Sequence, residues 1–183
     1  MANRSAHRPP GILRTLARLL RHRWTDGDLH RALPPDILHR LGQRVAASEQ
    51  RHSGQIRICV EGGLPLSYLW RGAGARERAI TLFGKLRVWD TEHNNGVLIY
   101  LLLAEHAIEV VADRGLTQHV PASTWHAMVA HMSTALRAER YEDGLTQALS
   151  EVSALLVAHF PRDPTQARDA AANELPDDPA VAP

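Results

Sequence analysis

The chain has 183 residues, 44% of them hydrophobic and 22% charged, which is the composition of a globular protein with one domain and short extensions. Lys and Arg number 21 against 20 Asp and Glu, and this balance predicts no binding of nucleic acid, which needs a clustered excess of positive charge. Cys59 is the single cysteine, so an intrachain disulfide is excluded.

Residues 1–33 are predicted to form a basic N-terminal extension with a short amphipathic helix. Six arginines precede Trp24 without an acidic residue, and they interrupt the apolar residues of the segment, which therefore lacks the apolar centre of a signal peptide. Within residues 12–24, apolar side chains recur every three or four positions, at Leu13, Leu16, Leu20 and Trp24. The helix could contact an anionic membrane surface, enter a groove on an unidentified protein partner, or pack against its own domain.

Residues 34–160 are predicted to form one α/β domain. The expected elements, in chain order, are a helix opened by Pro34 and Pro35, a strand from Gln55 to Glu61, a loop from Gly62 to Gly74, a helix from Ala75 to Val88, strands from Val97 to Ala104 and from Ala107 to Ala112, a helix capped by Ser123, and a last helix from about Glu142 to Phe160. Residues 161–183 are rich in Pro, Asp and Ala, and are predicted to form a disordered acidic tail.

The pattern also predicts a central mixed β-sheet sandwiched between helices. The run from Val97 to Ala104 is apolar throughout, which suits a central strand covered on both faces. It is far shorter than the roughly 20 residues that a membrane-spanning helix needs, so a cytoplasmic protein, at most peripheral to the membrane, is expected. One helix between the first two strands favours a parallel crossover. The strand from Gln55 to Glu61 alternates, which predicts that only one of its faces is strongly apolar.

Signatures of catalysis are missing from the sequence. Gly84-Lys85 lacks the flanking residues of a phosphate-binding loop, and no G-x-S-x-G or H-E-x-x-H motif occurs. Cys59 lies in a predicted strand, where packing is a better interpretation than nucleophilic catalysis. Nothing in the sequence supplies an activated nucleophile.

The polar segment before the central strand is the most informative part of the sequence. Asp90, Glu92, Asn94 and Asn95 place several hard oxygen atoms in one short loop, and calcium binds such oxygens. The same residues also suit an ordinary turn, because Asn and Gly accept left-handed backbone angles. On spacing alone, the ordinary turn is the simpler interpretation.

The run Asn94-Asn95-Gly96-Val97-Leu98-Ile99, followed by Ile108-Glu109-Val110 and Gly115-Leu116, resembles the TPM-domain family. That family includes thylakoid proteins of photosystem II repair and many uncharacterised bacterial proteins. Tyr141-Glu142-Asp143-Gly144-Leu145 and Gly54-Gln55-Ile56 are also similar to steps in the family pattern, so the resemblance covers roughly residues 34–160.

The resemblance implies an α/β sandwich, weak calcium binding near the Asn-Asn-Gly turn, and the weak acid-phosphatase activity of some members. It marks Asp90, Asn94 and Asn95 as site candidates. The chain departs from the family pattern at residues 91–93, where Gly and Lys are common in the family, and at Thr117, where an acid often stands.

Two functions from different classes follow. The first is a non-enzymatic binding or assembly module with a weak divalent-cation site. The second is a metal-dependent hydrolase of phosphate esters, with Asp90 and Asp113 holding the metal. Asp113 follows the second strand of the predicted hairpin, so it is expected at the same end of the sheet as Asp90. The predicted metal ligands are therefore Asp90, Asn94, Asn95 and Asp113, with calcium preferred over zinc because the ligands are oxygens.

Overall fold

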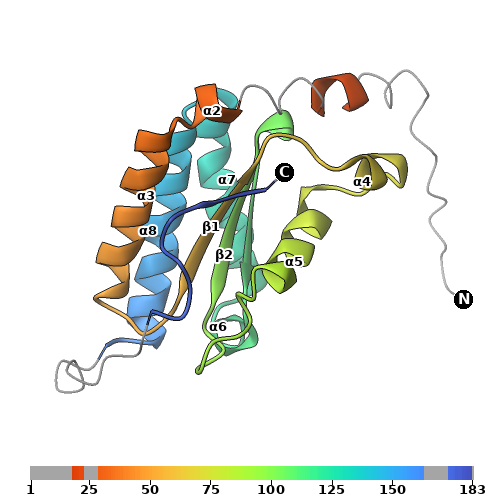
Figure 1. Ribbon diagram of the computed structural model, residues 1–183. Helices are drawn as coiled ribbons and strands as arrows, with labels where there is room; N and C mark the ends of the chain where they lie inside the picture. Colours follow the sequence, from red (N-terminus) through yellow and green to blue (C-terminus); the bar gives the residue numbers. More distant parts are fainter. Residues whose placement is uncertain (1–17, 23–28, 163–172, 183) are drawn as a thin grey trace, which may run out of the picture.

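The computed structural model describes residues 18–22, 29–162 and 173–182 (Figure 1). Their four strands form one sheet in the order β3-β2-β1-β4. The strands are β1 (Ile56–Glu61), β2 (Val97–Leu102), β3 (Ala107–Ala112) and β4 (Ala180–Ala182). Strand β1 runs parallel to β2 and to β4, whereas β2 and β3 are antiparallel. The expected mixed sheet, with its parallel crossover and its hairpin, is confirmed.

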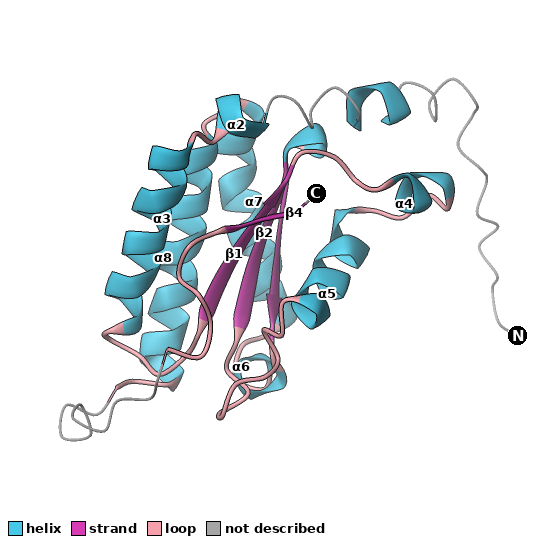
Figure 2. Cartoon of the chain, in the orientation of Figure 1, coloured by secondary structure: helices cyan, strands magenta, loops and turns pink. Residues whose placement is uncertain are grey.

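Helices cover both faces of this sheet. They are α2 (Leu29–Ala32), α3 (Pro35–Glu49), α4 (Leu66–Trp70), α5 (Ala75–Lys85), α6 (Arg114–Thr117), α7 (Ala122–Arg137) and α8 (Tyr141–His159). Figure 2 shows α3, α7 and α8 on one side of the sheet and α5 on the other, so the domain has three layers. The α/β sandwich predicted from the sequence is therefore confirmed.

The central strand β2 contributes to two separate apolar cores. Val97, Ile99 and Leu101 belong to the core with α3, α7 and α8. Leu98, Tyr100 and Leu102 belong to the core with α4 and α5. All six side chains are fully buried, because successive residues of a strand point to opposite faces. This arrangement explains why the sequence of β2 is apolar without alternation.

Several element boundaries differ from the sequence-based expectation. Strand β2 ends at Leu102, and the short 3-10 turn η1 (Leu103–Glu105) follows, with His106 in the left-handed region (φ 48°). The expected loop from Gly62 to Gly74 contains α4, because Pro65 pre-forms a helix start and Leu69 packs in the second core. Helix α7 starts after Pro121 and has no side-chain cap, so the cap predicted at Ser123 is wrong.

The second face of β1 is also more buried than its alternation predicts. Cys59 and Glu61 are both fully buried, and Cys59 belongs to the second core. Only one face of β1 is strongly apolar, as predicted, but the other face, with Cys59 and Glu61, is buried as well. The charged Glu61 is tolerated in this buried position because Arg78 of α5 pairs with it.

The ends of the described chain pack against the domain. Residues 18–22 are helical, whereas residues 1–17 and 23–28 of the predicted extension, with Leu13, Leu16 and Trp24 of its apolar stripe, lie outside the described residues. In the predicted tail, residues 173–182 differ from the expected disorder: they include β4, which pairs with the otherwise open edge of β1. Residues 163–172 and 183 lie outside the described residues. None of the helices that the structure describes is both long and apolar enough to cross a membrane.

Candidate functional site

The turn at residues 90–96 and the start of α6 meet at one corner of the sheet. The backbone N–H of Asp113 donates to the carbonyl of Gly96 (2.9 Å), and that of Gly115 donates to the carbonyl of Asn94 (2.9 Å). A Cβ atom at Gly115 would lie 2.5 Å from this Asn94 oxygen and 2.8 Å from that of His93, so the close approach requires glycine. The structure thus brings the Asn-Asn-Gly turn and Asp113 together, as the predicted hairpin implied.

Asp113 has one carboxylate oxygen in use and one without a partner. Its side chain caps α6 by accepting the N–H of Arg114 through Oδ1 (2.6 Å). Its Oδ2 is buried and has no hydrogen-bond donor among the described residues. Nearby, Oδ1 of Asn94 accepts from the Arg114 guanidinium (3.2 Å), and Asn94 itself has a left-handed backbone (φ 51°).

The other two predicted ligands have different surroundings. Asp90 is exposed, and its backbone N–H donates to the carbonyl of Arg87 (2.9 Å) at the beginning of the turn. Asn95 is buried and holds the turn, because its N–H donates to the Thr91 hydroxyl (3.1 Å) and its side-chain amide reaches Ser53 (3.5 Å). In the described part of the chain, no group of three or more His, Cys, Asp and Glu side chains is placed to hold a metal ion. A cation at this corner would depend on amide and backbone oxygens as well.

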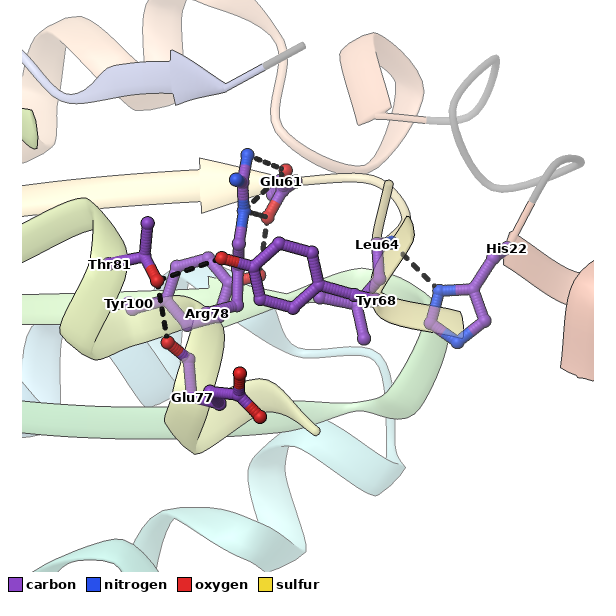
Figure 3. Close-up of polar contacts among 8 residues, drawn as sticks. All are labelled: His22, Glu61, Leu64, Tyr68, Glu77, Arg78, Thr81 and Tyr100. Atoms are coloured by element: carbon purple, nitrogen blue, oxygen red, sulfur yellow. Dashed lines mark hydrogen bonds and ion pairs between the residues drawn. The ribbon is translucent and has the colours of Figure 1, made fainter. Parts of the chain in front are cut away.

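A buried ion pair lies at the carboxyl end of β1 (Figure 3). The Arg78 guanidinium donates to the Glu61 carboxylate from Nε (2.9 Å to Oε2) and from Nη2 (2.6 Å to Oε1). The Tyr100 hydroxyl donates to Glu61 Oε2 (2.6 Å). Because three donors meet the carboxylate, its burial leaves no charge unpaired.

Aromatic residues surround this pair. The guanidinium carbons of Arg71 and Arg78 lie 4.6 Å and 5.3 Å from the centre of the Tyr68 ring, within cation–π range. The Tyr68 hydroxyl donates to Thr81 (2.8 Å) (Figure 3).

The Cys59 thiol lies close to this ion pair. Burial, and after it the negative charge of Glu61, raises the pKa of the Cys59 thiol to about 12. The thiol therefore stays protonated, and its place in the core agrees with a packing role.

Residues 18–22 are fixed to the loops at this end of the sheet. His22 Nδ1 accepts the backbone N–H of Leu64 (2.9 Å), so Nε2 carries the proton and donates to Glu105 (3.1 Å). Arg18 also pairs with Glu105 (2.8 Å). The hydrogen bond from His22, and then that from Arg18, lowers the pKa of the Glu105 carboxyl to about 2. For residues 18–22, these contacts support packing against the chain's own domain.

Two cavities lie elsewhere on the domain. One of about 380 Å³ follows the outer edge of β3, where Arg76 donates to the Val110 carbonyl (2.6 Å) and the buried Nε1 of Trp125 has no acceptor among the described residues. The other, of about 520 Å³, lies near η1 and is lined by polar residues that include Arg31, His106 and Tyr141. Neither cavity includes any of the four predicted metal ligands.

Sequence reasoning missed the Glu61–Arg78–Tyr100 cluster. A carboxylate at the end of a strand followed by an arginine seventeen positions later is too common a pattern to indicate a buried pair. One signal was usable: Glu61 lies in β1, and β1 pairs with the fully apolar β2, so an acid there is expected to need a buried partner.

The comparisons with known proteins agree on the fold. A sequence profile of the TPM domain matches residues 28–155. No curated protein matches the chain significantly. The NMR structure of the BA42 protein from the psychrophilic bacterium Bizionia argentinensis is 20% identical and has a TM-score of 0.69, over 82% of this chain and 95% of that one.

The solution NMR structure of the N-terminal domain of a protein from P. gingivalis is 18% identical, with a TM-score of 0.52, over 66% of this chain and 76% of that one. At these identities the likeness to both structures shows the fold alone. The sequence profile covers more than half of the chain, and we conclude that the chain belongs to the TPM domain family.

Proposed function

We propose that the chain is a non-enzymatic binding module whose corner at residues 90–96 and 113 holds a weakly bound calcium ion. The observation that carries this proposal is the buried Oδ2 of Asp113, which lacks a donor among the described residues. A buried carboxylate oxygen without a hydrogen bond is costly, and a cation would satisfy it.

The chemistry of the surrounding groups favours a hard cation. The side-chain oxygen of Asn94 and the backbone carbonyls of His93 and Asn94 lie on the same turn, which is packed against Gly115. Calcium takes carboxylate, amide and carbonyl oxygens together, whereas zinc prefers sulfur or imidazole. Asp90, exposed at the start of the turn, would contribute negative charge to the corner.

Two features make the expected affinity low. The Arg114 guanidinium already contacts the Asn94 side chain and would have to move or share it. Thr117, at the position where the family often has an acid, adds no negative charge. With one or two carboxylates, the site resembles calcium sites of millimolar affinity, at about 10⁻⁴ to 10⁻³ M.

Calcium titration of the full chain by calorimetry and NMR tests the proposal. Asp113→Asn is the sharpest variant, because asparagine also caps helices and so removes the charge while keeping the start of α6. We expect this variant to lose calcium binding and Asp90→Ala to weaken it. Asp143→Asn, at an exposed acid of α8, is the matched control and should bind as the wild type does.

Absence of calcium binding at millimolar concentration, or unchanged binding by Asp113→Asn, would contradict the cation site. A phosphatase assay with added divalent metals tests the binding role separately. If turnover is measurable in the wild type and lost in Asp90→Ala, the protein is a metal-dependent hydrolase, and the proposal of a non-enzymatic binding module is wrong.

A further inference from the structure

Residues 173–182, here called the C-terminal strap, lie along the edge of β1 that β2 leaves open. Strand β4 of the strap lies beside β1 (Figure 2) and pairs in parallel with its end. Cys59 is opposite Ala180, and Glu61 is opposite Ala182. The match to the TPM domain ends at residue 155. The strap therefore lies outside the residues matched to the TPM domain, and β4 adds a fourth strand to the sheet.

Two side chains at the start of β1 contact the backbone of the strap. The Gln55 side-chain oxygen accepts the N–H groups of both Glu174 and Leu175 (3.1 Å each). The Arg57 guanidinium donates to the carbonyls of Asp178 (2.6 Å) and Pro176. Side chains that bind backbone groups, next to a parallel strand pairing, are how a sheet edge recognises an extended peptide.

One apolar side chain anchors the strap. Leu175 is only 5% exposed and belongs to the same apolar core as Val88 and Leu98. Beyond it, acidic residues follow at positions 177 and 178, close to Arg57. Glu174, on the other side of the anchor, accepts the backbone N–H of Glu92 (3.0 Å). The segment that fills this edge is thus extended, with a leucine anchor and an acidic residue on each side of it.

Helix α3 has a glycine where the strap passes. A Cβ at Gly42 would lie 2.6 Å from Oδ1 of Asp178 and 3.3 Å from its Cα. Glycine inside a helix is disfavoured relative to alanine, so a specific reason is needed for it here. The room that it leaves for the strap is such a reason, and it shows that α3 forms one wall of the strap's groove.

We propose that the edge of β1 is a peptide-binding site for an extended segment with a leucine anchor and flanking acidic residues, and that the strap occupies it within the chain. A partner protein that carries such a segment would compete with the strap. Because the strap is tethered to the domain, its effective concentration at the site is in the millimolar range. A partner must therefore bind more tightly than the strap, or be present at a higher concentration, to displace it. The strap meets the turn of the cation corner through the hydrogen bond between Glu174 and the Glu92 backbone, but it includes none of the four predicted metal ligands.

The test opens the site in the full-length chain and offers it a peptide. In Leu175→Asp the strap loses its anchor while the groove stays intact. A fluorescein-labelled peptide of residues 173–183 is then titrated, with anisotropy as the measurement. We expect it to bind this variant at least about tenfold more tightly than the wild type, in which the strap competes. If Leu175→Asp fails to fold, Leu175→Ala is the milder replacement, and it too should bind the peptide more tightly than the wild type does.

Variants of the groove and of the peptide provide the controls. Added to the Leu175→Asp chain, Gly42→Leu should abolish peptide binding by filling the groove, and Arg57→Gln should weaken it. Gln43→Leu, at an exposed neighbouring position of α3, should leave binding unchanged. A peptide that itself carries Leu175→Asp should not bind.

Three outcomes would overturn the proposal. The first is a folded Leu175→Asp chain, shown by circular dichroism, that does not bind the peptide. The second is equal binding to this variant and to the wild type, or binding that survives Gly42→Leu. The third is a wild-type dimer that the peptide dissociates, which would assign the site to strap exchange between two copies of the chain instead of a separate partner.

Discussion

Glu49, at the end of α3, makes a prediction about stability and pH that can be worked out from its surroundings. It is 8% exposed, and its Oε1 accepts the backbone N–H of Ile56 at the start of β1 (2.7 Å). Burial raises the pKa of the Glu49 carboxyl from 4.5 to about 7; the hydrogen bond from Ile56 opposes this shift, and the nearby charge of Asp177 adds to it.

The sign and size of the effect follow from this pKa. Between pH 4.5 and about 7, the folded protein binds more protons at Glu49 than the unfolded chain, so the free energy of unfolding falls as the pH rises through this window. Above about pH 7 the destabilisation is complete, and the difference between the two pKa values corresponds to about 3 kcal/mol. Glu49→Gln keeps an acceptor for Ile56 and removes the charge. We therefore expect it to stabilise the protein by about 3 kcal/mol at about pH 8 and to have almost no effect at about pH 4.

Urea unfolding of wild type and Glu49→Gln across this pH range measures the effect. The difference between the two proteins is the informative quantity, because burial lowers the pKa of His52 to about 4 and gives the wild type a pH slope of the opposite sign. Glu139→Gln, at an exposed position, is the control and should change stability little at any pH. A Glu49→Gln protein that is not stabilised at about pH 8, or is stabilised equally at about pH 4, would refute the reasoning.

Two further predictions concern the buried ion pair and the N-terminal segment. Glu61→Leu should destabilise the protein by about 3–5 kcal/mol because it leaves the buried Arg78 charge unpaired, and adding Arg78→Met should recover much of that loss. A double-mutant cycle by urea unfolding measures both effects, and additive losses of stability would contradict the pairing. A chain that starts at Ala32 should melt at a lower temperature than the full chain, because it loses the contacts of Arg18 and His22 with Glu105. Unchanged melting, together with liposome sedimentation by the full chain alone, would instead support the membrane-contact interpretation.

The sequence was sufficient where burial leaves a local pattern. The unbroken apolar run of β2 predicted a strand covered on both faces, since both of its faces do meet a core. The short turn at residues 105–106 predicted the hairpin, and the hairpin in turn placed Asp113 beside the Asn-Asn-Gly turn. For the candidate site, this adjacency was predictable, but the use of Asn95 to hold the turn and the exposure of Asp90 were not. Whether a side-chain oxygen points into a corner or into solvent depends on packing that no local pattern records.

The tertiary structure alone decided the charged interior and the last strand. Glu61 and Glu49 look like surface acids in the sequence, and they are buried because partners from α5, β2 and the start of β1 reach them. The strap contacts residues 119 positions earlier in the chain, and its Pro- and Asp-rich composition resembles that of a disordered tail. It is ordered because the open edge of β1 offers unpaired backbone groups, a place for Leu175 and a glycine-lined wall. Periodicity reports which face of an element is buried, whereas an open sheet edge exists only once the strands have assembled.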